Sequence, residues 1–264
     1  MLRAAAEFMS AKAYYLRIAC LIGVIVVAVG IVVHLPPIPQ DSAYHNFSDD
    51  KLHWGTPNGS NVISNVSFMI AGLVGLMRTR SCTGARMTFM WRFFFCAIAF
   101  VGLGSAYYHW QPSNNTLFWD RLPMTLGFAS LTACLCADRF GLRIGSLLFG
   151  PLVLSGLLSV LYWLITEQAG AGDLRPYVLM QYLPILLVPL ILTLFPKNST
   201  NDRYYWILLC CYIIAKGFEM QDNYIFEMTH YLISGHTLKH IIAGVGILMF
   251  RPDKFENEIV GKYP

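Results

Sequence analysis

Apolar stretches alternate with short polar segments along the whole chain. Several of these stretches reach the roughly 20 residues that a helix needs to cross the hydrocarbon core of a membrane. Prolines at positions 151, 184 and 189 do not argue against helices, because packed membrane helices tolerate them. The pattern predicts an all-α membrane protein with eight spans in one bundle. The spans are expected at residues 17–35, 61–77, 89–109, 122–137, 143–165, 177–195, 204–219 and 236–250.

The composition indicates the same class of protein. Of the 264 residues, 56% are hydrophobic and only 13% are charged, and the mean hydropathy is +0.51. An ordinary soluble domain has about a quarter of its residues charged. The composition therefore excludes a typical soluble domain.

The distribution of cationic residues predicts the orientation of the spans. Lysine and arginine gather in the loops of one side, and cytoplasmic loops are the ones enriched in these residues. We therefore expect both termini in the cytoplasm. The net charge of +4 lies almost wholly in these loops, so it indicates topology and not nucleic-acid binding. The residues on this side are Arg3, Lys12, Arg17, Arg78, Arg80, Arg86, Arg92, Arg139, Arg143, Lys197, Arg203, Arg251, Lys254 and Lys262, whereas the other side has Lys51, Arg121 and Arg175.

Three histidines are expected at the outer ends of two spans. His109 ends the third span, while His236 and His240 open the last one in 234-SGHTLKH-240. Two histidines at i and i+4 lie on one helical face. With a third from another helix they make the three-ligand set of a catalytic zinc site, which leaves the fourth position for water.

More ordinary interpretations of these histidines exist. A single histidine at a membrane border is usually an interfacial residue, and an H-x-x-x-H pattern alone is a weak signal. Haem ligation is a further alternative, but two histidines at i and i+4 of one helix cannot supply both axial positions. The zinc hypothesis gains support because a serine and a carboxylate are expected at the same depth, where polar groups are costly.

The serine and the carboxylate are Ser105 and Asp120. Ser105 shares a helical face with His109, and Asp120 opens the fourth span. Alone, Ser105 would be a packing residue between glycines, and Asp120 would be a helix N-cap. Beside a zinc ion, Asp120 could instead take a proton from the bound water.

Five short motifs resemble those of the alkaline ceramidase (alkaline phytoceramidase) family of the CREST membrane hydrolase superfamily. The segment 102-GLGSAYYH-109 resembles G-x-G-S-x-x-x-H, and 120-DRLPM-124 resembles D-E-L-P-M. The others are 61-NVISN-65, which resembles N-x-x-S-N, 222-DNYIF-226, which resembles D-N-I-F, and 236-HTLKHIIAGVG-246, which resembles H-x-x-x-H-x-x-x-G-x-G. The motifs occur in the family's order over residues 44–250.

The resemblance implies a seven-helix core with the first span as an addition. We then expect a cytoplasmic tail (1–16), an extra N-terminal transmembrane helix (17–35), a ceramidase-like domain (36–250) and a second tail (251–264). Residues 17–35 could also be the hydrophobic region of a signal peptide. No small-residue cleavage site precedes 36-PPIPQ-40, so a retained anchor is favoured.

The resemblance also assigns roles to residues. It implies that His109, His236 and His240 bind Zn²⁺, that Ser105 lies near the substrate carbonyl, and that Asp120 handles protons. The reaction would be hydrolysis of the amide of a ceramide-like lipid to a fatty acid and a long-chain base. Residues expected to orient the ligands or contact substrate are Glu219, Asp222, Asn61, Asn65 and Tyr108.

A zinc-activated water explains how these residues would work together. Zinc lowers the pKa of bound water to about 7 and polarises the carbonyl. Asp120 would accept the proton and deliver it to the leaving nitrogen. Ser105 would donate a hydrogen bond to the developing oxyanion, an interaction worth roughly 3–4 kcal/mol.

The chain departs from the family pattern where the family binds calcium. Its members carry an acidic stretch with a glutamate shortly before N-x-x-S-N, and here 52-LHWGTPNGSN-61 has no glutamate. Asp41, Asp49 and Asp50 do not map onto the family's spacing. The resemblance therefore gives no support for Ca²⁺.

Two other classes of function remain open. A receptor of the adiponectin-receptor type would use the same site, but such receptors carry a long cytoplasmic N-terminal domain. A proton-coupled transporter often shows internal repeats, and none is evident. The expected partners are the bilayer and a lipid substrate. The short loops favour a bacterial inner membrane over an ER or Golgi membrane, with the site on the periplasmic or lumenal side. The sequence does not predict an oligomeric state.

Overall fold

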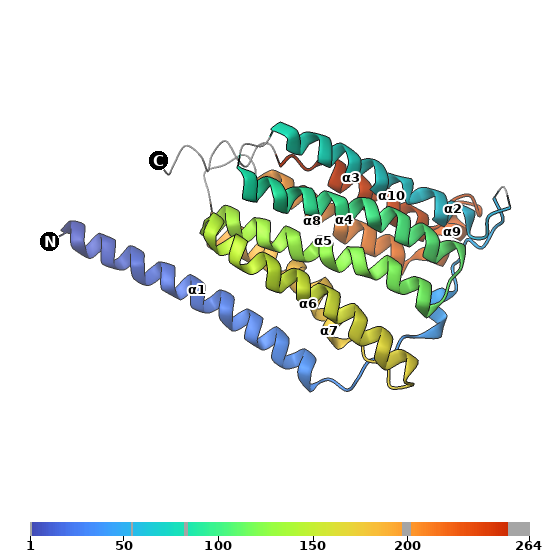
Figure 1. The fold of residues 1–264 in the computed structure, drawn as a ribbon, viewed down its shortest axis with the longest axis horizontal. Helices are drawn as coiled ribbons and strands as arrows, with labels where there is room; N and C mark the ends of the chain where they lie inside the picture. Colours follow the sequence, from blue (N-terminus) through green and yellow to red (C-terminus); the bar gives the residue numbers. More distant parts are fainter. Residues whose placement is uncertain (1, 54, 82–83, 197–201, 253–264) are drawn as a thin grey trace.

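The computed structural model describes residues 2–53, 55–81, 84–196 and 202–252 as a bundle of long helices (Figure 1). Besides short 3-10 turns at Ser42–His45 and Thr79–Ser81, these residues contain one isolated bridge, between His53 and Thr56. The α-helices are α1 (Leu2–His34), α2 (Gly59–Ser64), α3 (Val66–Arg78), α4 (Ala85–Trp110), α5 (Asn114–Phe140), α6 (Leu142–Gln168), α7 (Arg175–Leu194), α8 (Asp202–Met220), α9 (Asp222–Met228) and α10 (Gly235–Met249).

All eight predicted spans coincide with helices, which confirms the all-α class. Five helical stretches are long and apolar enough to cross a membrane: Lys12–His34, Gly59–Arg78, Ala85–Trp110, Leu142–Gln168 and Arg175–Leu194. This is consistent with a multi-pass membrane protein. The remaining three predicted spans lie in α5, α8 and α10; α10 has only 15 residues, and α5 and α8 carry charged side chains. The number of crossings therefore stays a prediction.

Three details differ from the predicted pattern. Helix α5 begins at Asn114 with Ser113 as its N-cap, so Asp120 lies inside this helix and does not open it. The second span divides into α2 and α3 at Asn65, where the backbone stays close to helical. The short helix α9 lies in what was expected to be a loop, so 222-DNYIF-226 is helical. The cationic residues Lys197, Lys254 and Lys262 lie outside the described residues, as does the second predicted tail beyond Pro252.

Helix α1 stands at the edge of the bundle and packs mainly against α7 (Figure 1). From Lys12 to its end, most of its apolar side chains, such as Val26 and Ile31, are exposed, as expected for a helix surrounded by lipid. Its end is tied to α7 by Arg175, which donates to the carbonyls of Val33 and Leu35 at 3.1 and 2.7 Å. Helix α1 begins, and α10 ends, at the same end of the bundle.

The end of the bundle at which α10 ends is filled by large side chains. Trp91, Phe95, Tyr205 and Phe250 are almost fully buried there. Trp91 and Tyr205 both contact the ring of Phe250, with centroids 5.1 and 5.3 Å apart. This packing joins α4, α8 and the end of α10, and so holds in place the helices that carry the histidines at the opposite end.

The segment between α1 and α2 covers the opposite end of the bundle, called the site end below. Ile38 accepts a backbone hydrogen bond from Leu174 at 2.8 Å. Gln40 accepts a hydrogen bond from the buried guanidinium of Arg121 at 2.6 Å. That guanidinium also lies over the ring of Trp163, 4.4 Å from its centroid. The segment is thereby held against α5 and α7.

Candidate metal centre

The turn between α4 and α5 places functional side chains from both helices at the site end. Helix α4 ends just before Pro112, which cannot continue the helix. Ser113 then begins α5 with a capping box, in which its side chain accepts from the amide of Thr116 and Thr116 bonds back to Ser113. Because the turn is short, the last turns of α4 face the first turns of α5.

Helix α10 begins with a buried cap of its own. The Ser234 hydroxyl accepts a hydrogen bond from the amide of Thr237 at 3.1 Å, which places His236 in the first turn. Asp222 accepts from the amide of His236 at 2.7 Å through one oxygen, and from the amide of Ser48 at 3.1 Å through the other. An acidic side chain at this position also stabilises the helix dipole.

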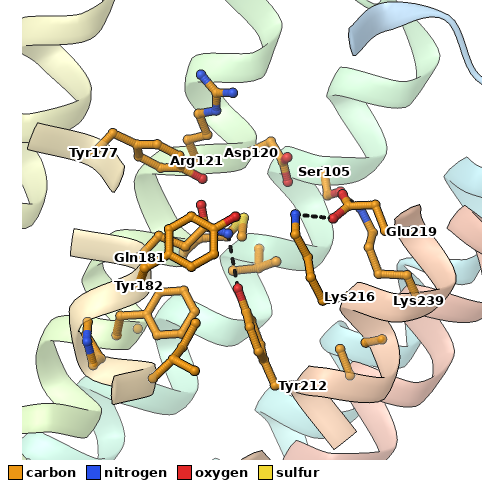
Figure 2. A pocket seen from close by; sticks show the side chains of 18 of the residues that line it. Ser105, Asp120, Arg121, Tyr177, Gln181, Tyr182, Tyr212, Lys216, Glu219 and Lys239 are labelled. Carbon is orange, nitrogen blue, oxygen red and sulfur yellow. Dashed lines mark hydrogen bonds and ion pairs between the residues drawn. The ribbon is translucent and has the colours of Figure 1, made fainter. Parts of the chain in front are cut away.

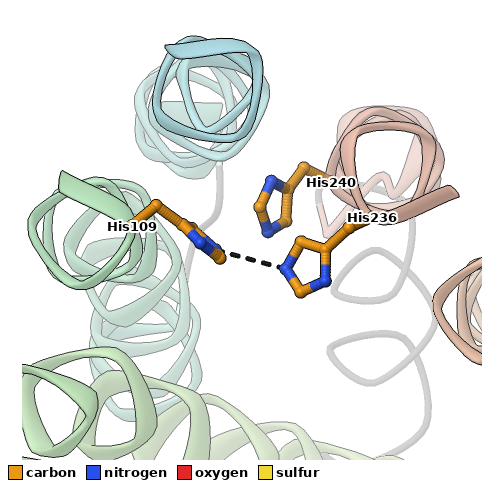
Figure 3. A group of neighbouring side chains, drawn as sticks. All are labelled: His109, His236 and His240. Atoms are coloured by element: carbon orange, nitrogen blue, oxygen red, sulfur yellow. Dashed lines mark hydrogen bonds between the residues drawn. The ribbon is translucent and has the colours of Figure 1, made fainter. Parts of the chain in front are cut away.

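The structure brings the three predicted histidines together (Figure 3). His109 comes from α4, and His236 and His240 come from α10. One nitrogen of each ring lies within 4.8 Å of the others, and the Nε2 atoms of His109 and His236 are 3.3 Å apart. All three side chains are buried. This geometry confirms that the triad could hold a metal ion.

The ligand chemistry of the triad fits a bound metal, which would take the place of the contact between Lys239 and Nε2 of His236. His109 Nδ1 is buried without a hydrogen-bond partner among the described residues, and an unpaired buried polar atom is costly. Three imidazoles within reach of one another provide nitrogen ligands, which suit Zn²⁺, Cu, Fe and Ni. The ring of Phe47 covers His109 and His236, with centroids 4.5 and 5.0 Å away, and limits the access of water.

Ser64 is a functional candidate that the sequence analysis did not single out. Its hydroxyl lies 2.8 Å from Nδ1 of His240 and donates to the Asn61 carbonyl at 3.0 Å. Since a hydroxyl has one proton, it accepts from Nδ1–H of His240, and Nε2 is left as the free nitrogen. The signal was present, because Ser64 is the serine of 61-NVISN-65.

The two asparagines of that motif hold α2 against α10, which carries two of the three histidines. Asn61 and Asn65 are completely buried. Asn61 accepts a hydrogen bond from the Thr237 hydroxyl at 2.8 Å, and Asn65 donates to the Asn61 carbonyl at 2.7 Å. They connect α2 to the first turn of α10, and the backbone of Asn61 also interacts with the His240 ring.

The ring of Tyr108 lies beside that of His109, with centroids 5.0 Å apart, but its hydroxyl bonds elsewhere. Its hydroxyl donates to the Tyr44 carbonyl at 3.4 Å and lies 2.9 Å from Nδ1 of His45. The ring packs against Phe47, which itself covers the triad. The structure therefore places Tyr108 under the segment between α1 and α2, where it holds that segment in position.

Ser105 and Asp120 lie near one another at a close contact between α4 and α5 (Figure 2). A side chain at Gly104 would lie 1.9 Å from the Trp119 carbonyl oxygen, so only glycine permits this approach. The Ser105 hydroxyl and the Asp120 carboxylate consequently face the same space. Both side chains, together with His240, line one cavity.

That cavity has a volume of about 430 Å³ and runs along the bundle between α4, α5, α7, α8 and α10. Its polar part contains Ser105, Asp120 and His240. Its deeper part is apolar, so its shape and lining suit a molecule with one polar end and an aliphatic chain. The apolar lining includes Phe94, Ile98, Val101, Leu131, Val188 and Ile247.

Glu219 lies on the α8 side of this polar part. Its carboxylate accepts from both Lys216 and Lys239, the latter at 3.0 Å. Lys239 also lies 2.8 Å from Nε2 of His236. Glu219 was expected near the site from the sequence, but Lys239 was not, although a lysine within 236-HTLKH-240 is an unusual residue for a membrane helix.

A scan of the chain against protein-family models finds no match, and a search of curated proteins finds no significant match either. The fold and the site define a helical, membrane-type protein with a buried histidine triad that could hold a metal ion. The likeness to alkaline ceramidases rests on the five sequence motifs.

Proposed function

We propose that the protein is a zinc-dependent intramembrane amidohydrolase that cleaves the N-acyl amide of a ceramide-like lipid to a fatty acid and a long-chain base. One observation carries this proposal. Ser105, Asp120 and a histidine of the triad line the polar part of a cavity whose remainder is apolar. An amide placed among these groups would have room for its acyl chain in the deeper part.

The triad is proposed to hold the metal through His109, His236 and His240. When bound there, zinc would supply a nucleophilic water at neutral pH and polarise the carbonyl. Phe47 and the segment around it keep bulk water from the imidazoles, which strengthens electrostatic interactions inside the site.

Asp120 and Ser105 are proposed to transfer the proton and to stabilise the developing oxyanion. Asp120 accepts the proton of the attacking water and returns it to the amide nitrogen as the C–N bond breaks. Ser105, one helical turn before His109, donates a hydrogen bond to the carbonyl oxygen as negative charge develops on it. The products are then a fatty acid and an amine.

The same proposal includes an orientation in the membrane. With eight spans and both termini in the cytoplasm, the site would lie on the periplasmic or lumenal side. The positions of the helix ends support this, because the end of α4 and the start of α10, which carry the triad, lie opposite to the start of α1 and the end of α10 (Figure 1). A bacterial inner membrane is favoured, with an ER or Golgi membrane as the eukaryotic equivalent.

A lipid panel tests the proposed reaction. Purified protein should release fatty acid from at least one of ceramide, dihydroceramide and phytoceramide. A chelator should abolish this release and added Zn²⁺ should restore it. Asp120→Asn protein is the matched control for contaminating hydrolases, because its release should be near background. Release that is equal in the variant and the wild type would contradict the proposal.

A further inference from the structure

Two lysines lie at the polar part of the cavity, inside the helical bundle (Figure 2). Lys216 belongs to α8 and Lys239 to α10, and both approach Glu219. Charged groups within membrane helices are costly, so they mark functional positions. The hydrolysis proposed above has no role for Lys216.

Some of the N–H donors of Lys216 have no acceptor among the described residues. An ammonium group has three N–H donors. The only described side chain that accepts from Lys216 is Glu219, and that carboxylate is shared with Lys239. Lys239 has a second contact, with His236. Lys216 therefore keeps two N–H donors without an acceptor in the described part of the protein.

These donors face the cavity. One third of the Lys216 side chain is accessible, and Lys216 lines the cavity together with Ser105 and Asp120. In Figure 2 its ammonium group points into the space between Glu219 and Asp120. A lipid whose amide lies beside Ser105 would thus present its neighbouring polar groups to Lys216.

We propose that Lys216 binds an anionic group on the amine half of the substrate. The preferred substrate is then an N-acyl lipid that carries a carboxylate, sulfonate or phosphate close to the amide. Such a group supplies several acceptor oxygens for the unused donors, and charge-assisted hydrogen bonds are the strong ones. This inference rests on the proposed function, because it names the substrate class of the same site.

Two matched compounds test whether Lys216 binds an anionic group of the substrate. N-palmitoylglycine and N-palmitoylethanolamine share the acyl chain and the amide, and differ in a carboxylate against a hydroxymethyl group. For the wild type we expect kcat/KM to favour N-palmitoylglycine by about tenfold or more, as one charged hydrogen bond allows. The preference should disappear in Lys216→Met and persist in Lys216→Arg. Lys12→Met, which removes a charge from exposed α1, should keep it.

A binding measurement separates this inference from the proposed reaction. Thermal stabilisation by each compound is measured in full-length Ser105→Ala protein, in which turnover is slow. Stronger stabilisation by N-palmitoylglycine that depends on Lys216 supports the inference, even if neither compound is cleaved. A failure to cleave both compounds would count only against the proposed hydrolase activity. Equal stabilisation by the two compounds, or a preference that survives Lys216→Met, overturns it. If Lys216→Met does not fold, Lys216→Gln takes its place.

Discussion

The Ser64 hydroxyl lies 2.8 Å from Nδ1 of His240, and it bridges this ring to the Asn61 carbonyl. The hydroxyl donates to the carbonyl, so it accepts from the imidazole. The His240 ring is thereby held in one tautomer, with its Nε2 free on the side of His109 and His236. A partner of this kind fixes the orientation of a metal ligand.

Ser64→Ala should therefore weaken metal binding about 10- to 100-fold. Without the hydroxyl, His240 can adopt the other tautomer and rotate. Competition with a chromogenic chelator measures the affinity. Ser67→Ala is the matched control, because Ser67 lies three residues further on, in the first turn of α3, and among the described residues donates only to the carbonyls of Ser64 and His240. Equal affinities of Ser64→Ala and the wild type would contradict this role.

The sequence predicted the triad because its signal is local. An i and i+4 pair on one helix, and a histidine at the end of another, can be placed from hydropathy alone. Ser64 could not be assigned in this way, because its contact with His240 joins residues 176 positions apart and depends on how α2 packs against α10. The same holds for Lys239, whose contact with Glu219 forms only when α8 and α10 lie side by side.

Some motif residues have roles that the motif did not reveal. Tyr108 belongs to the same motif as Ser105 and His109, yet its hydroxyl bonds to the segment between α1 and α2. Neighbouring residues on a helix point in different directions, so the residues of one motif can have different roles. The break at Asn65 was also missed, because the hydropathy of residues 61–77 is continuous.

Gly104→Ala should lower activity more than it lowers metal content. The added methyl group would meet the Trp119 carbonyl and push α5 away from α4, which separates Asp120 from Ser105. Overpacking of this kind costs about 1–3 kcal/mol of stability. Gly150→Ala in α6 is the control, because nothing lies within 4 Å of the new methyl group. Thermal unfolding in detergent and kcat are measured for both variants. Unchanged kcat in Gly104→Ala would show that the close approach does not matter.

Asp120→Asn should keep the metal and lose turnover, because an amide cannot accept the proton. Ser105→Ala should lower kcat by about 10²–10³-fold, the usual effect of removing one oxyanion donor. Metal content and kcat are determined on the same preparations. Full activity of either variant would remove the corresponding residue from the mechanism.

Acid should loosen the attachment of α1. Arg175 donates hydrogen bonds to Asp173 and thereby lowers the pKa of this carboxyl from 3.8 to about 2. A carboxyl whose folded-state pKa is depressed stabilises the fold above its unfolded pKa and stops doing so as the pH falls from about 4 to about 2. The same guanidinium holds the carbonyls of Val33 and Leu35 at the end of α1.

Thermal unfolding between pH 2 and pH 6 tests this prediction. The wild type should be more stable than Asp173→Asn by a constant amount above about pH 5, and the difference should vanish near pH 2. A difference that stays constant over the whole range would show that Asp173 does not respond to acid in this way.

The metal content of the purified protein tests the central claim most directly. Elemental analysis should find about one zinc ion per chain, as expected for a three-histidine site. His34→Ala should keep it, because His34 is exposed on α1 and, among the described residues, bonds only to the Gly30 carbonyl. His236→Ala should lose both the metal and fatty-acid release. Full retention of zinc in His236→Ala would contradict the assignment of the histidine triad as the metal centre.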